Sequence, residues 1–88
     1  MDKRAAPISD HLRAALRGLY ASAEQAIEER PLTRPEIAEL GGYLELWGAI
    51  LQAETIPRSW VDRLLFSVLR ADPARYNEVS ALVSHGSN

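Results

Sequence analysis

The sequence contains no cysteine, so the chain can form neither a disulfide framework nor a thiolate metal site. It also lacks a long apolar run. The longest strongly apolar stretch is Leu64-Leu65-Phe66, far shorter than the roughly 20 residues that cross a bilayer. The opening residues, MDKRAAPISD, include two basic side chains but no apolar segment behind them, which predicts no signal peptide. From these absences we expect a cytoplasmic protein that does not enter the membrane.

Lysine is almost absent as well: the chain has nine arginines but a single lysine, Lys3. The formal net charge is −2, and it divides unevenly, with −3 over residues 1–54 and +1 over residues 55–88. An acidic front half repels the phosphate backbone, so nucleic acid is an improbable partner for it. The excess of arginine, together with thirteen alanines, indicates a bacterial or phage genome rich in GC.

Eighty-eight residues, of which 47% are apolar and 25% charged, have the composition of one folded domain. No stretch alternates between apolar and polar residues as a half-buried strand does, so the fold class we predict is all-α. We expect a compact four-helix domain over residues 1–88, in which a long antiparallel helical hairpin precedes two shorter helices. Residues 1–7 and 85–88 are predicted to be frayed tails.

The two hairpin helices have clear boundary signals. Ser9 is a predicted N-cap for the first helix, which ends at Arg30-Pro31 because proline disfavours the α conformation of the residue before it. The second helix begins with the capping box Thr33-Arg34-Pro35-Glu36 and is predicted to reach about Glu54. An apolar stripe at steps of three and four along the first helix indicates lengthwise packing; it comprises Leu12, Leu16, Leu19, Ala23 and Ala26.

The two shorter helices have weaker signals. We predict that Ser59 caps the third helix, WVDRLLFSVLR, and that Asp72-Pro73 opens the fourth, which runs to about Ser84. The predicted buried face of the third helix comprises Val61, Leu64, Leu65, Val68 and Leu69.

The pair Gly41-Gly42 could be the turn of a DNA-binding helix-turn-helix or part of one continuous helix. The segment after it, YLELWGAILQAE, has no basic residue with which to contact base edges and phosphates, which argues against the first interpretation. Both glycines fit a helical pattern whose two apolar seams cover more than half of the circumference. We therefore predict a continuous second helix, placed centrally with neighbours on several sides. The seams are Ile37, Leu40, Leu44, Trp47 and Leu51, and beside them Tyr43, Leu46, Ile50 and Ala53.

The residue types of catalytic sites occur without the required arrangement. Ser9-Asp10-His11 resembles a hydrolase triad in composition, but adjacent side chains at a helix start point apart. The acidic cluster Glu24, Glu28 and Glu29 has no histidine at ligand spacing and is better explained as a solvated helix end. We expect neither enzymatic activity nor a metal or other cofactor.

The third helix has an anomaly that indicates a binding surface. Phe66 points about 140° away from Val61 and stands between Arg63 and Arg70. Phenylalanine flanked by arginine is typical of protein interfaces, although Phe66 could equally lie under another segment. Arg75 and Tyr76 are predicted to extend this patch.

The function we expect is that of a small protein-binding module: a regulator, adaptor or inhibitor. The alternatives are a nucleic-acid-binding regulator that uses Arg58, Arg63, Arg70 and Arg75, and a structural subunit of a larger assembly. Because so small a core supplies little stability, self-association through the broad apolar face of the second helix is also expected.

Overall fold

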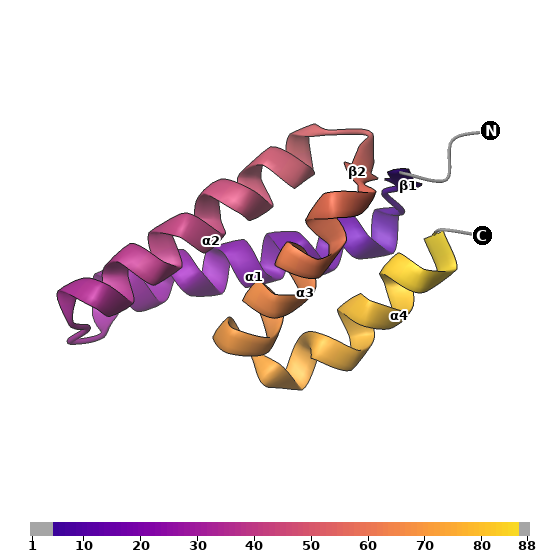
Figure 1. Cartoon of the computed structure of the whole chain (residues 1–88). Coiled ribbons are helices and arrows are strands. Elements are labelled where there is room, and N and C mark those ends of the chain that lie inside the picture. Colours follow the sequence, from indigo (N-terminus) through magenta and orange to yellow (C-terminus); the bar gives the residue numbers. More distant parts are fainter. Residues whose placement is uncertain (1–4, 87–88) are drawn as a thin grey trace.

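The computed structural model describes the backbone of residues 5–86 and the side chains of residues 8–83. Helices α1 (Asp10–Glu29) and α2 (Arg34–Gln52) form a long antiparallel hairpin, and α3 (Arg58–Ala71) and α4 (Tyr76–Gly86) pack against part of it (Figure 1). A 3₁₀ turn, η1 (Pro73–Arg75), joins α3 to α4, and two short strands, β1 (Ala5–Pro7) and β2 (Thr55–Pro57), pair at one end. The predicted all-α four-helix fold is confirmed.

Side-chain caps start both hairpin helices, as predicted. The Ser9 side chain accepts a hydrogen bond from the Leu12 amide at 3.1 Å. At the start of α2, the Thr33 hydroxyl accepts from the Glu36 amide and the Glu36 carboxylate accepts from the Thr33 amide, so the capping box is complete. These bonds satisfy amides that have no partner within the helix, and they fix the start of each hairpin helix.

The starts of the two shorter helices differ from the prediction. Helix α3 begins at Arg58, directly after Pro57, and no side chain caps it; Ser59 lies inside the first turn. Asp72 makes no capping hydrogen bond, because its carboxylate forms an ion pair with Arg75 at 3.3 Å. Pro73 begins η1, where its fixed φ suits the first turn, whereas Pro57 precedes α3 as an N-cap residue that has no side-chain acceptor to offer.

A short β-ladder stands where the sequence predicted only a frayed tail. Strand β1 pairs antiparallel with β2, and Ala6 lies opposite Ile56. The Ile8 amide continues the pairing by donating to the Glu54 carbonyl at 3.2 Å. Helix α4 also reaches Gly86, so residues 85 and 86 are helical, whereas the predicted tail residues 1–4, 87 and 88 lie outside the described part.

Helix α2 runs without interruption through Gly41 and Gly42, which confirms the continuous interpretation. No glycine in the described residues has a positive φ. The helix ends at Gln52, two residues before the predicted end. There the Arg13 guanidinium of α1 donates to the carbonyls of Leu51 and Ala53 at 2.5 and 2.6 Å, which satisfies acceptors that the ended helix leaves open.

The core lies where α3 and α4 cover the hairpin, and Trp47 is at its centre. The indole is fully buried, and its Nε1 donates to the Ser67 hydroxyl at 2.9 Å. That hydroxyl in turn donates to the Leu64 carbonyl at 2.6 Å, so the two buried polar side chains satisfy each other. The other fully buried large side chains are Leu12, Leu16, Leu19, Ile50, Ile56, Leu64, Val68 and Val79.

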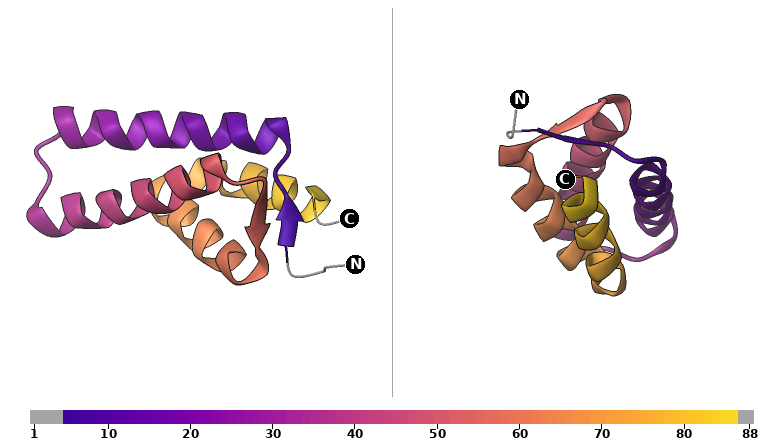
Figure 2. Two further views of the ribbon diagram at one scale, coloured as in Figure 1. Left: turned by 90° about the horizontal axis from the view of Figure 1, so that it is seen from above. Right: turned by 90° about the vertical axis from the view of Figure 1, so that its right-hand side faces the viewer.

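The core does not extend along the whole hairpin. No residue from 24 to 46 is buried, and the molecule measures 46 × 19 × 19 Å because the turn end of the hairpin projects beyond α3 and α4 (Figure 2). The prediction of a second helix surrounded on several sides is therefore wrong for its first half. There α2 packs mainly on α1, and α3 reaches it only with its last turn, through the Arg70–Glu39 ion pair, because α3 is too short to reach the hairpin turn.

Candidate functional site

Phe66 lies on the outer side of α3, with 60% of its surface exposed. Its neighbours in the sequence explain this placement: Leu64 and Val68 are fully buried, and a residue two positions from either one points about 160° away on a helix. The predicted exposure of Phe66 is confirmed. No segment of the described chain covers the ring.

Three exposed side chains surround Phe66, namely Arg63, Leu69 and Arg70. Together with Phe66 they form a surface that we call the α3 face. Arg63 and Leu69 are three residues from Phe66, and Arg70 is four residues away, so all three are its neighbours on the helix surface. Leu69 was predicted to be buried, but it is 47% exposed. It lies about 140° from Leu64, outside the sector that meets the core.

Arg70 connects the α3 face to α2. Its guanidinium forms an ion pair with the Glu39 carboxylate at 3.3 Å, and hydrogen bonds to Glu39 and Tyr43 raise the pKa of Arg70. Partial burial, followed by the nearby negative charge of Glu39, raises the pKa of the Tyr43 hydroxyl. Because both partners are well exposed, water screens this ion pair, and its main effect is to hold the Arg70 side chain toward α2.

Arg75 and Tyr76 were predicted to extend the patch around Phe66, but they lie elsewhere. Arg75 is paired with Asp72, and its Nη1 lies 3.2 Å from the position that a Cβ on Gly18 would occupy, so the guanidinium packs on α1. Tyr76 is partly buried against the core. The turn η1 changes the direction of the chain after α3, and for this reason helical spacing does not carry across it.

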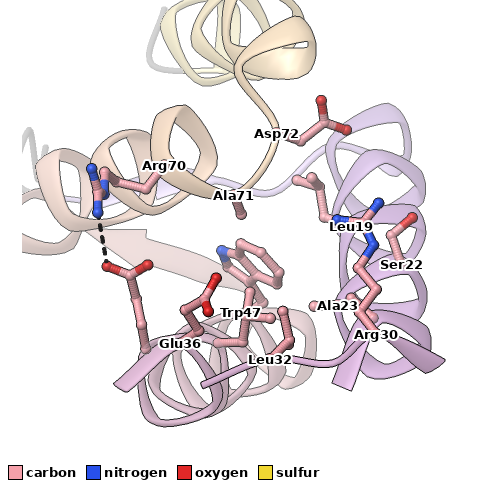
Figure 3. Close-up of a pocket in the computed structure, with 13 residues that line it drawn as sticks. Leu19, Ser22, Ala23, Arg30, Leu32, Glu36, Trp47, Arg70, Ala71 and Asp72 are labelled. Atoms are coloured by element: carbon pink, nitrogen blue, oxygen red, sulfur yellow. Dashed lines mark hydrogen bonds and ion pairs between the residues drawn. The ribbon is translucent and has the colours of Figure 1, made fainter. Parts of the chain in front are cut away.

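A groove that the sequence did not reveal lies beside the α3 face. It has a volume of about 450 Å³ and is bounded by α1, the first part of α2 and the end of α3 (Figure 3). Apolar side chains form its floor, including Leu19, Ala23, Leu40 and Trp47. Its rim is charged, with Arg30 on the α1 side, Glu36 and Glu39 on the α2 side, and Arg70 and Asp72 on the side of α3.

The groove arises because α3 ends before it reaches the hairpin turn, a tertiary feature that periodicity does not predict. The apolar seam of Ile37, Leu40 and Leu44 was the available signal, since it is longer than α3 can cover.

The residue types of a hydrolase or metal site do not come together in the described part of the chain. The Ser9 oxygen is engaged in capping α1, and His11 is exposed on the first turn of that helix. Among the described residues no group of three or more histidine, aspartate and glutamate side chains is placed to hold a metal ion. The described surfaces include an exposed aromatic ring between arginines and a groove with apolar side chains at its floor and charged side chains at its rim.

No known protein family, curated protein or solved structure matches the chain. Within residues 5–86, no helix is both long enough and apolar enough to span a bilayer.

Proposed function

We propose that the protein is a non-enzymatic protein-binding module, a regulator, adaptor or inhibitor, and that it binds its partner through the α3 face. The observation that carries this proposal is the 60% exposure of Phe66 between Arg63 and Arg70. The lack of cysteine supports a site of action in the reducing cytosol.

An exposed phenylalanine contributes little to the stability of the free monomer but much to a complex. Complete burial of such a side chain stabilises by about 1.5–3 kcal/mol. Leu69 extends the apolar centre, and the aliphatic stems of Arg63 and Arg70 can cover the edges of the ring while their charged groups stay in water. Aromatic residues and arginine are both enriched at the hot spots of protein interfaces, and the α3 face combines the two.

The alternative function, nucleic-acid binding, requires four arginines that point at phosphates. Two of the four are already paired with carboxylates, Arg70 with Glu39 and Arg75 with Asp72, and Arg75 packs against α1. These pairs lower the positive charge that a phosphate backbone would meet. Salt separates the two functions, because nucleic-acid binding falls steeply as salt is added whereas an apolar contact hardly changes.

Affinity capture from the native host, with nuclease present, tests the proposal. The wild-type protein should retain a specific protein partner that Phe66→Ala loses. The matched control is Gln52→Ala, which shortens another exposed side chain on α2, outside both the α3 face and the groove. Equal retention by the wild type and Phe66→Ala, or binding that disappears with nuclease treatment, would contradict the proposal.

A further inference from the structure

The turn end of the hairpin has an apolar surface but no core of its own. From residue 24 to residue 46 no side chain is buried, although the segment contains Ile27, Leu32, Ile37, Leu40, Tyr43, Leu44 and Leu46. Most of the stability of a helix in a protein comes from packing of its apolar face against other elements. This part of the hairpin therefore lacks the neighbouring helices that its sequence is suited to contact.

The groove provides the place where such neighbours could pack. It begins above Trp47 and Leu19, where α3 ends, and extends along both arms to Arg30 and Leu32 at the turn (Figure 3). Leu40 belongs to its floor, and Ile37, one turn earlier on α2, is 41% exposed. Between the buried core at Trp47 and the hairpin turn, Leu40 is thus partly exposed and Ile37 is exposed.

The rim charges identify the partner that fits. Arg30 lies on the α1 side of the groove and Glu36 on the α2 side, and neither forms an ion pair with another residue in the described range. In a contact with two-fold symmetry, residue i of one subunit meets residue j of the other, and the reverse contact forms as well. One opposite-charge pair on this surface therefore becomes two ion pairs between identical copies.

We propose that two copies of the chain pack through the turn ends of their hairpins, with the grooves facing each other, and form a four-helix arrangement. In this dimer Leu32, Ile37 and Leu40 of both copies share one apolar layer, and Arg30 of each copy faces Glu36 of the other. The dimer surface meets the α3 face at Arg70 but excludes Phe66 and Leu69, so variants of Phe66 and Ile37 test the two proposals separately.

Sedimentation velocity over about 1–200 µM protein tests the dimer, since this range covers micromolar dissociation constants. The wild type should convert from the 9.8 kDa chain to twice that mass as the concentration rises. Ile37→Glu should weaken the association at least about tenfold. This substitution places a charge in the apolar layer, and because Ile37 is not packed against the monomer core, circular dichroism should show an intact fold.

Charge variants test the orientation of the two copies. Arg30→Glu should weaken the dimer, because it would bring two carboxylates together at each pair. Adding Glu36→Gln, which removes the second carboxylate but keeps an acceptor for the Thr33 amide, should recover part of the association. Phe66→Ala is the matched control and should leave the association unchanged. A wild type that stays monomeric over the whole range would overturn the proposal, and so would a dimer that Phe66→Ala disrupts but Ile37→Glu does not.

Discussion

Replacing both Gly41 and Gly42 by alanine should stabilise the protein. The two residues lie in the interior of α2, and nothing is within 4 Å of the position that a Cβ would take at either one. Alanine is more favourable than glycine in a helix interior by about 0.8–1.0 kcal/mol per residue. Part of this gain arises in the unfolded chain, which has fewer conformations to lose when glycine is replaced.

The two gains should sum to about 1–2 kcal/mol, since neither new methyl group meets another side chain. For a domain of this size, that corresponds to an increase in melting temperature of about 4–15 °C. Urea unfolding followed by circular dichroism at 222 nm measures the change directly. All samples need the same protein concentration, because self-association would also alter the apparent stability.

Gly48→Ala is the control variant, because Gly48 also lies inside α2 but has the side chain of Tyr20 close to it. A Cβ at Gly48 would lie 3.5 Å from Cε2 of Tyr20, an ordinary van der Waals contact, so the single variant should gain no more than about 1 kcal/mol. A Gly41→Ala, Gly42→Ala variant that is no more stable than the wild type would refute the argument. It would mean that the glycines permit a bend or a close approach that the straight helix does not have.

Three further variants test the capping box, the hairpin contact and the α3 face. Thr33→Ala should destabilise the fold by about 1 kcal/mol in urea unfolding, because the α2 amide loses its acceptor. The same variant should raise the pKa of Glu36 only in part, because the Thr33 backbone hydrogen bond, the larger cause of the lowered pKa, remains and the side-chain hydrogen bond is lost; NMR titration would detect this. In the wild type, the stability that these bonds contribute is present above the unfolded-state pKa and is lost as pH falls through the folded-state pKa. Gly48→Leu should destabilise by about 1–3 kcal/mol by pushing against Tyr20, and an unchanged melting temperature would show that the ring moves aside freely. Phe66→Ala should change the unfolding free energy by less than about 0.5 kcal/mol, whereas a loss of 3–5 kcal/mol would identify Phe66 as a core residue.

The hairpin could be predicted from the sequence because its signals are local. The capping box at Thr33 involves residues three apart, and Arg30-Pro31 ends α1 through the steric restriction on the residue before proline. The exposure of Phe66 followed from the same kind of argument, since its direction depends only on the helix that carries it.

The features that could not be predicted depend on contacts between distant segments. Pairing of β1 with β2 joins residues about 50 positions apart, and three-residue strands are too short to show an alternating pattern. Arg75 looked like part of the patch around Phe66 until η1 redirected the chain toward Gly18. The groove depends on where α3 ends relative to the hairpin, and the sequence pattern within one helix does not predict that position.

Photo-crosslinking from position 66 tests whether the α3 face binds a protein partner. With the photoreactive amino acid benzoylphenylalanine in place of Phe66, illumination in the native host should produce a discrete adduct with a protein partner. The same residue in place of Ala49, which is exposed on α2 outside both proposed surfaces, should give no such adduct. We expect a nuclease-resistant protein adduct that is specific to position 66; no adduct there, or the same adducts from both positions, would contradict partner binding through the α3 face.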